Sequence, residues 1–466
     1  MTARWIAAAA ALALAGCTTV GPNYTLPPQA AANIPSAQGQ FDSGKEKLFA
    51  DVPLPDHWWQ LYGDARLDQF VAEGLAANSD LRAADANLRR ADAVVAEVAA
   101  GRTISTSLAG SATLARPYGT GTTLPGTVGY DVGLSLAYPL DLSGQITRAI
   151  EAAKGDAEAV AAARDNVRVT VAAEIARSYA SACTANMVLA ANNRVLALQR
   201  QTLGVTQRLQ RGGRGTAFDV TRAQSAVDQS AALVPATIAT RTAALYRLAT
   251  LMGRAPADYP RDVATCARPP SMTKQLPIGD GAAMIARRPD IRAAERTLAA
   301  ATARIGVATA SLYPQVSLGG SVGLTGPLSA FPSGNAFNIG LGPLINWSFP
   351  NRRIVRAQIA QAGASADSAL AQFDSTTLEA LRQTETALSA YAREADRNAA
   401  LARAQASAAT AANQAATLYR FGRTDFLSLL SAQAALTTAQ ANLAASSALL
   451  VDRQVDVFKA LGGGWQ

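Results

Sequence analysis

Residues able to do chemistry are few in this sequence. Histidine occurs once, as His57, and cysteine occurs three times among 466 residues. His57 stands beside Trp58 and Trp59, where a packing or turn contact explains it better than metal binding, because no second histidine can share a metal. No Ser/His/Asp or paired-carboxylate constellation stands out either. We therefore expect no enzyme activity, no metal site and no cofactor.

The first cysteine, Cys17, ends an N-terminal leader. Arg4 supplies a positive n-region, residues 6–15 an apolar core, and Leu14-Ala15-Gly16 a small-residue cleavage site. The stretch L-A-G-C resembles the bacterial lipobox, in which cleavage leaves the cysteine as the first residue for acylation. Several acyl chains on Cys17 would anchor the chain stably. Thr18 replaces the aspartate that retains lipoproteins in the inner membrane, so the resemblance implies the outer membrane.

The other two cysteines are Cys183 and Cys266. In an oxidising compartment an even pair can form a disulfide. Two buried free thiols are the alternative, because the sequence does not show whether the two residues are close in space.

Charge and hydropathy exclude two classes of protein. The formal net charge is +8, but arginine and carboxylates are interspersed along the helical stretches and form no single basic block. Such a pattern is typical of a solvated helix surface and argues against nucleic-acid binding. Beyond the extreme N-terminus no unbroken apolar run reaches about 18 residues, so we expect no membrane-spanning helix. Much of the apolar content is alanine, the best helix former.

The chain carries an internal duplication. Residues 78–91 and 288–301 share a motif, and the matched positions Asp80 and Asp290 lie 210 residues apart. Residues 209–224 and 418–433 match in the same way. Each repeat therefore contains the same series of elements: a helix, a hairpin, a long helix, a turn and a second helix.

Two segments change from helical to alternating periodicity. In residues 128–138 valine, leucine and tyrosine alternate with glycine, serine and Asp131, and a similar alternation follows in residues 316–347. We predict β-hairpins at 103–140 and 315–349. A tilted strand of about 9–11 residues crosses a bilayer, which favours membrane strands over a soluble hairpin packed on helices. Aromatic residues cluster near the strand ends, as in an interfacial girdle: Tyr130, Tyr138, Tyr313, Phe331, Phe337, Trp347 and Phe349.

Helices fill most of the remainder. The first is expected near 65–101, and long helices near 143–211 and 352–420 would each span roughly 100 Å. The expected domain organisation is a signal peptide (1–16), a lipidated extended tether without helix (17–55), a first repeat (56–252) with tip turn 211–219, a Pro-rich linker (253–278), a second repeat (279–461) with tip turn 420–428, and a C-terminal tail (462–466).

Four strands cannot close a membrane barrel, which needs about eight, and open edges leave backbone groups unsatisfied in lipid. Either the strands lie outside the membrane or several chains share one barrel.

Several long motifs resemble the outer-membrane factor family, in its NodT-like efflux lipoprotein branch related to TolC. They are L-A-G-C with G-P-N-Y, W-W-Q-L-Y-G-D-A-R-L-D-Q-F, R-R-P-D-I-R-A-A-E-R-T-L and Y-R-F-G-R-T-D-F-L-S-L-L. The resemblance implies a mainly α fold with membrane β, in which a homotrimer forms one twelve-stranded outer-membrane barrel on a long periplasmic helical tunnel. It also implies the exit duct of a tripartite efflux system, passing small molecules from an inner-membrane transporter through a periplasmic adaptor. A duct for type I protein secretion is the alternative.

The resemblance also implies a gate at the tip turns, whose glycines are Gly213 and Gly422. Tyr419, Arg420 and Asp219 match residues that hold the periplasmic tip closed in the family. Arg423 and Asp425 are further candidates, or solvated turn residues. Ser431 stands where the family's gate aspartate is common.

Overall fold

The computed structural model describes residues 19–115, 127–266, 268–272, 274–331 and 336–463. Contacts divide the chain into two units. Unit 1 comprises the described parts of Met1–Ala30, Asn87–Ala161 and Ala293–Asp374. Unit 2 comprises Ala31–Ala86 and the described parts of Ala162–Arg292 and Ser375–Gln466. Both repeats contribute to both units, so the units do not correspond to the two halves of the duplication.

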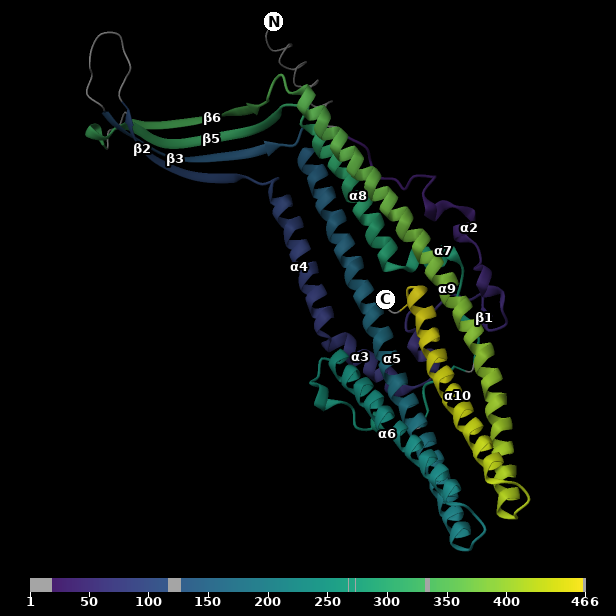
Figure 1. The fold of residues 1–466 in the computed structure, drawn as a ribbon. Helices are drawn as coiled ribbons and strands as arrows, with labels where there is room; N and C mark the ends of the chain where they lie inside the picture. Colours follow the sequence, from purple (N-terminus) through teal and green to yellow (C-terminus); the bar gives the residue numbers. More distant parts are fainter. Residues whose placement is uncertain (1–18, 116–126, 267, 273, 332–335, 464–466) are drawn as a thin grey trace. The chain divides into compact units, whose positions relative to one another are not determined.

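Unit 1 contains a four-stranded antiparallel sheet, drawn in Figure 1. Its order is β2 (Ser105–Ala115), β3 (Thr127–Leu140), β5 (Gln315–Pro327) and β6 (Phe337–Asn346). The strands confirm both predicted hairpins, and pairing of β3 with β5 joins the hairpins of the two repeats. Within the chain β2 and β6 are therefore the two edges of the sheet.

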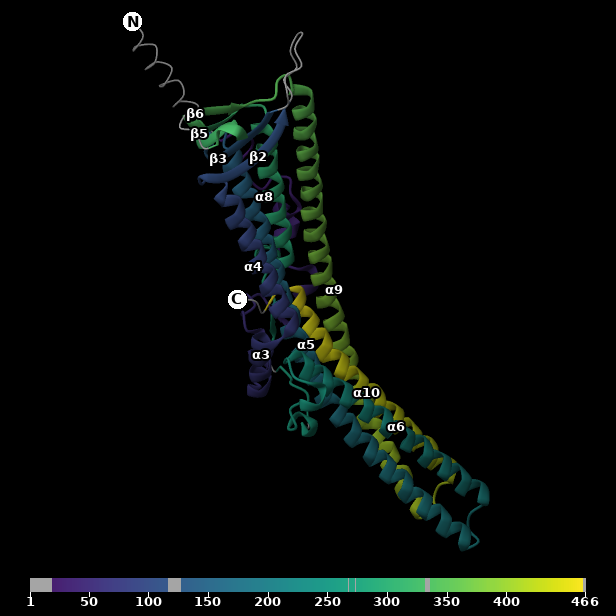
Figure 2. The same ribbon diagram turned by 90° about the vertical axis from the view of Figure 1, so that its left-hand side faces the viewer.

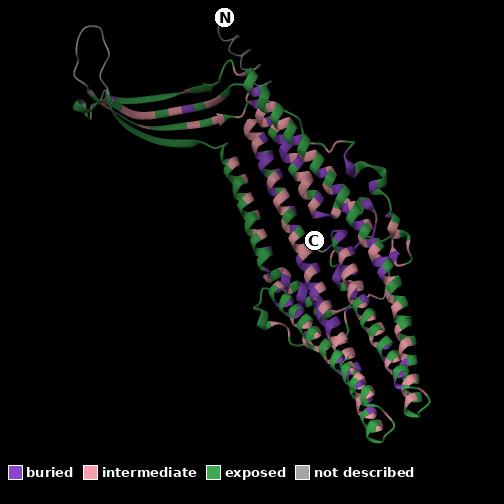
Figure 3. Ribbon diagram, viewed as in Figure 1, coloured by how far each residue is buried: buried purple, intermediate pink, exposed green. Residues whose placement is uncertain are grey.

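The register gives each face of this sheet its own chemistry. One cross-strand row is Leu108, Leu134, Val322 and Ile339, and the adjacent row is Ser107, Ser135, Ser321 and Gly340. Successive side chains of a strand point to opposite faces, so the apolar row and the small polar row lie on different sides. In Figure 3 the edge strands β2 and β6 are mostly exposed, whereas the interior strands β3 and β5 also carry many intermediate residues. The alternation of the sequence thus becomes one apolar face and one polar face.

Alanine-rich helices make up most of the chain. Four of them contribute residues to both units: α4 (Ser79–Ala100), α5 (Gln145–Arg211), α8 (Pro289–Ala310) and α9 (Arg352–Arg420). The others belong to unit 2: α3 (Ala65–Ala77), α6 (Ala217–Leu251), α7 (Gly281–Arg287) and α10 (Phe426–Ala460).

The helix predicted near 65–101 is wrong in one respect, because Asn78 divides it into α3 and α4. Asn78 has extended backbone angles, and its side-chain oxygen accepts hydrogen bonds from the backbone N–H groups of Asp80 (2.9 Å) and Leu81 (3.1 Å). These bonds satisfy donors that a helix start leaves free. The second repeat breaks at the matched position, Arg288, before Pro289.

The segment before α3 is also not free of helix, contrary to expectation. It contains α2 (Pro35–Gln38) and three 3₁₀ turns at Ala31–Asn33, Asp42–Lys45 and Trp58–Tyr62. Pro35 begins α2, where its missing N–H costs nothing because the first helical donors have no intrahelical partner. The strand β1 (Phe49–Ala50) pairs in parallel with β4 (Leu276–Pro277), which lies in the Pro-rich linker.

Aromatic side chains build part of the core of unit 2. Trp58 is fully buried and stacks on Phe458 of α10, with ring centroids 4.6 Å apart. His57 packs edge-on against Trp59 at 5.2 Å, which confirms the packing interpretation of this histidine. Among the described residues α10 is the one helix long and apolar enough to span a membrane by length and composition, a test that core helices also pass.

Candidate gate at the helix turns

The two tip turns have the same backbone hydrogen bonds. In the first, Gly213 has φ +72° and the N–H of Arg214 donates to the carbonyl of Leu209 at 2.9 Å. In the second, Gly422 has φ +68° and the N–H of Arg423 donates to the carbonyl of Leu418, also at 2.9 Å. This is the Schellman ending of a helix, which favours glycine in the left-handed conformation. Figures 1 and 2 show both turns at the same end of unit 2.

Asp219 is used at the start of its own helix. Its carboxylate accepts hydrogen bonds from the Thr216 hydroxyl (2.7 Å) and backbone N–H (3.1 Å), and its own N–H donates to the Thr216 hydroxyl (3.1 Å). This reciprocal capping box satisfies two free donors at the start of α6.

Asp425 has the corresponding role at the start of α10. Its carboxylate accepts from the backbone N–H of Ser428 (2.6 Å) and from the Ser428 hydroxyl (3.1 Å). Both bonds lower the pKa of Asp425, and the bond from the Ser428 backbone is the larger cause. Ser431, at the family's aspartate position, donates its hydroxyl proton to the Ser428 carbonyl at 3.0 Å.

Of the remaining predicted gate residues, Tyr419 and Arg420 end α9, and Arg423 lies in the turn that follows. The ring of Tyr419 lies 5.8 Å from that of Phe426. Within the described part of the chain, the ion pairs include neither Arg420 nor Arg423. The structure of a single chain therefore brings neither Asp219 nor Asp425 to these guanidinium groups.

Sequence reasoning did not single out the apolar residues beside the turns. Phe218 is 66% exposed, Phe421 71% and Leu427 54%. The guanidinium of Arg222 lies 5.4 Å from the Phe218 ring centroid, over its face. Large apolar side chains grouped at an exposed end are typical of a protein interface. The sequence offered one indication of this apolar group, because Phe218 and Phe421 both lie within three positions of a helix end.

A buried polar contact joins the two helix hairpins behind the turns. The side-chain amide of Gln433 in α10 donates to the Thr202 hydroxyl of α5 at 3.0 Å, and Gln433 is only 2% exposed. Beside this contact lies a cavity of about 510 Å³. Its lining comes from α5, α6 and α10 and combines polar residues with apolar ones: Gln199, Arg222, Ser225, Gln229, Ser230 and Thr437, and Leu233, Leu430 and Ala434 among others. The same two hairpins also meet at an ion pair between Arg177 of α5 and Asp456 of α10 at 2.6 Å.

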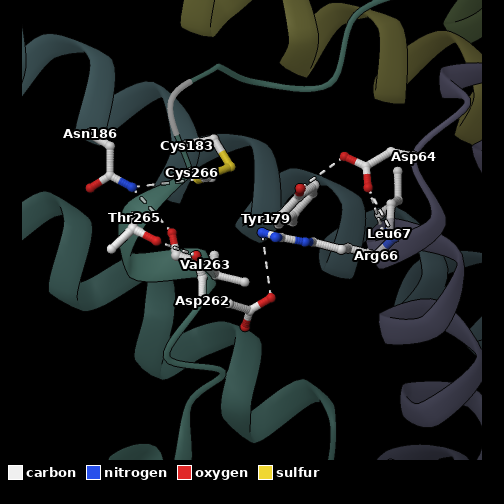
Figure 4. The surroundings of a disulfide bond; sticks show 10 residues. All are labelled: Asp64, Arg66, Leu67, Tyr179, Cys183, Asn186, Asp262, Val263, Thr265 and Cys266. Carbon is white, nitrogen blue, oxygen red and sulfur yellow. Dashed lines mark hydrogen bonds and ion pairs between the residues drawn. A yellow bond between two sulfur atoms is a disulfide. The ribbon is translucent and has the colours of Figure 1, made fainter.

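A disulfide bond joins Cys183 of α5 to Cys266 of the Pro-rich linker (Figure 4). Of the two alternatives that the sequence left open, the structure therefore has the disulfide and not two free thiols. The Asn186 amide donates to the Val263 carbonyl at 3.1 Å beside it. A further ion pair, between Arg66 and Asp262 at 3.4 Å, ties the same linker to α3. The linker is therefore attached to unit 2 by both covalent and polar contacts.

The sheet of unit 1 has almost no charge. Asp131 of β3 is the one charged residue on the four described strands of the sheet, and it lies on the face with Ser135. Near the strand ends Tyr130 packs edge-on against Phe331 (4.8 Å), and Trp347 lies 5.3 Å from Phe349.

Among the described residues no group of three His, Cys, Asp or Glu side chains could hold a metal ion. Cys17 lies outside the described residues.

Comparisons with known proteins agree with this architecture. A family model described as "Outer membrane efflux protein" matches residues 71–254 and 282–463, one match in each repeat. The chain is 31% identical to "Nodulation protein T" of Rhizobium leguminosarum bv. trifolii over 93% of this chain and 91% of that protein. It is 28% identical to "Probable efflux pump outer membrane protein TtgC" of Pseudomonas putida over 98% and 95%.

The solved structure of the outer-membrane channel OprN superimposes with a TM-score of 0.87 at 36% identity, covering 96% of this chain and all of that one. The fold is thus that of TolC-like outer-membrane channels, with a periplasmic helical tunnel and a β domain. Members of the matched family are efflux channels of the outer membrane rather than enzymes. The chain belongs to the outer membrane efflux protein family.

Proposed function

We propose that three copies of this chain assemble into one passive efflux duct. The observation that carries the proposal is the four-stranded sheet, whose edges β2 and β6 have no further partner strand among the described residues. An open edge in lipid leaves unsatisfied N–H and C=O groups, each of which costs several kcal/mol. Three sheets joined edge to edge give twelve strands, which is enough for a closed barrel.

The apolar sheet face would then contact lipid, and the polar face would line the lumen. The lumen face carries serine or glycine on every strand, with Asp131 as its charge. Such a wall makes only loose contacts with cargo, so it suits small molecules of varied chemistry. A transporter in the inner membrane would supply both the energy and the selectivity.

The gate would form between chains at the tip turns. Arg420 and Arg423 have no carboxylate partner among the described residues of their own chain, whereas an adjacent chain would present its own turns to them. Asp219 and Asp425 would accept such contacts through oxygens that already cap helices. The exposed Phe218, Phe421 and Leu427 would receive the apolar tip of a periplasmic adaptor protein.

The N-terminus would add a lipid anchor. Cleavage after Gly16 leaves Cys17 as the acylated first residue, which holds the chain at the outer membrane. Residues 19–463 then lie in the outer-membrane barrel and the periplasm.

A deletion strain tests the transport function. Loss of the gene is expected to raise the accumulation of, and sensitivity to, at least one toxic small molecule, and the wild-type gene should restore resistance. If deletion changes secretion of a protein but no small-molecule sensitivity, the duct serves type I secretion and the efflux proposal is wrong. Separately, planar bilayers should show channels with discrete conductance steps for the purified protein.

A further inference from the structure

The segment that follows Cys17 is held in unit 1 by one buried side chain. Arg148 of α5 is 4% exposed, and its guanidinium donates to the Val20 carbonyl (3.0 Å), the Gly21 carbonyl (3.1 Å) and the Asn23 side-chain oxygen (2.7 Å). A fourth bond, to Glu151 at 2.7 Å, balances its charge. Few charged side chains are buried to this extent without a fixed partner, and here most of the partners belong to the N-terminal segment.

The groove for this segment is made by glycine. Gly21 has φ +88°, which L side chains rarely adopt, and a Cβ on it would collide with the Cα of Gly306 in α8. A Cβ on Gly306 would lie 2.9 Å from the Val20 carbonyl oxygen and 2.7 Å from Cγ of Arg148. The extended chain therefore crosses α8 at a distance that only glycine permits on both sides.

The groove ends at the junction of strand and helix. The N–H of Val20 donates to the Ser143 carbonyl at 3.1 Å, between the end of β3 and the start of α5. Gly144, with φ +73°, lies against Thr19, where a Cβ would be 2.8 Å from the Thr19 Cα. Further along, the Tyr24 hydroxyl donates to Glu295 of α8 at 3.2 Å. The chain from Thr19 to Tyr24 is thus fixed at successive points.

We propose that Arg148, Gly21 and Gly306 form an intramolecular docking site that fixes the lipidated N-terminus to the β3–α5 junction. Cys17 precedes Val20 by three residues, which span at most about 11 Å when extended. The acyl chains must therefore enter the lipid leaflet beside the helix-proximal ends of the strands. The partner of this site is the phospholipid leaflet at that level, reached through the acyl chains.

This inference rests on the proposed acylation of Cys17. The docking site adds a consequence to that acylation. Because the segment after Cys17 is fixed, the acyl chains are held at a defined position beside the sheet and are not attached through a flexible segment. Arg148 acts as a positioning residue, since it contacts the segment and not the lipid.

Limited chymotrypsin digestion of the purified full chain tests the docking site. Cleavage after Tyr24 releases the N-terminal peptide and leaves a new N-terminus at Thr25. Arg148→Ala removes three charge-assisted bonds to the segment, so we expect this cleavage to accelerate roughly tenfold or more. Arg304→Ala is the matched control, because Arg304 pairs with Asp156 on the surface of the same unit and should leave the rate unchanged.

A second pair of variants avoids loss of a buried charge. Gly306→Ala places a methyl group against Val20 and Arg148, and should also accelerate cleavage after Tyr24. Gly363→Ala is its control, since a Cβ on this helical glycine of α9 would meet no atom of the other described residues within 4 Å, apart from the backbone of its own helix. Far-ultraviolet circular dichroism checks that each variant keeps its helices.

Mass spectrometry of the released peptide tests the acylation of Cys17 separately from the docking site. Normal acylation of Cys17 with accelerated cleavage in Arg148→Ala and Gly306→Ala, but not in their controls, is the expected result. Normal acylation with equal cleavage in all variants would overturn the docking site alone. An unacylated Cys17 would overturn the lipid anchor of the proposed function, and with it the role given to the site.

Discussion

The Gln433 amide of α10 donates a 3.0 Å hydrogen bond to the Thr202 hydroxyl of α5, and both side chains are buried. This bond connects the α5–α6 hairpin to the α9–α10 hairpin on the turn side of unit 2. Any motion that separates the hairpins must break it, and must leave at least one polar group without a partner. The bond therefore stabilises the arrangement of the two hairpins in this structure.

Replacing Gln433 with leucine should loosen this arrangement. The substitution leaves the buried Thr202 hydroxyl without its donor, at a cost of about 1–3 kcal/mol. We expect a lower unfolding temperature and more frequent channel openings in planar bilayers. Gln224→Ala is the control, because Gln224 is exposed and its amide donates along its own helix to Asp228 at 2.9 Å. Equal opening frequencies in the two variants would exclude Gln433 from the gate.

Arg420→Ala should raise the opening frequency as well, for a different reason. The Arg420 guanidinium is free of carboxylates in the described part of its own chain, so its contact in the closed channel would be with an adjacent chain. Loss of one exposed charge pair is worth about 0.2–1 kcal/mol, and more for a partly buried one. Arg403→Ala, on the exposed surface of α9, is the control. If single-channel records of Arg420→Ala and wild type coincide, the gate lies elsewhere.

Removing the disulfide should destabilise unit 2. The bond closes a loop with a sequence separation of 83, and native disulfides of this kind typically contribute about 2–4 kcal/mol. The double variant Cys183→Ala/Cys266→Ala should unfold at a lower temperature and be cut faster by trypsin after Arg261 in the linker. A reductant should lower the unfolding temperature of the wild type and leave the double variant unchanged. An identical response of both proteins to the reductant would show that the bond contributes no stability.

Asp452 predicts a pH dependence in unit 2. Burial is the main cause that raises its pKa, and Asp456 and Glu174 add to it, while Arg177 and Arg453 oppose the shift. Because the folded state binds this proton more tightly than the unfolded state, the stability it contributes is present at low pH and is lost as pH rises through the raised pKa. Asp452→Asn should therefore unfold at a higher temperature than wild type at pH 7.

The difference between Asp452→Asn and wild type should shrink as the pH falls toward about 4, the ordinary range of a carboxyl group. Asp396→Asn, an exposed position paired with Arg393, should show no such gain at pH 7. A lower unfolding temperature for Asp452→Asn at pH 7 would mean that the ion pair with Arg177 outweighs the cost of burial.

Local pattern was enough to predict most of the fold. Alternation in residues 128–138 identified a strand because its two faces meet different surroundings, and β3 covers that range. Periodicity could not reveal the break at Asn78, which depends on one side chain capping α4 and bonding to Leu251, 173 residues away. The disulfide could not be predicted either, because the spacing of Cys183 and Cys266 in the sequence does not determine the distance between them in space.

The two tip turns could be predicted, but the contacts of the residues beside them could be predicted only in part. Glycines marked both tip turns because a left-handed ending of a helix favours glycine. The capping roles of Asp219 and Asp425 were not foreseen, although Thr216 three residues before Asp219 is the signature of a capping box. The contacts of Arg148 could not be predicted from the surrounding sequence, because its partners Val20 and Gly21 lie 128 and 127 residues away.

In the proposed assembly, three chains share one barrel through the edges β2 and β6. Leu108→Cys on β2 and Ile339→Cys on β6 introduce thiols at exposed edge positions, while Cys183 and Cys266 are bonded to each other. Thiol cross-linkers of graded length applied to the double variant in outer membranes should give covalent dimers and trimers and no larger species. Leu134→Cys on the interior strand β3, paired with Leu108→Cys, should cross-link only within one chain. Monomers alone from the edge variant, or a ladder beyond three chains, would contradict the shared twelve-stranded barrel.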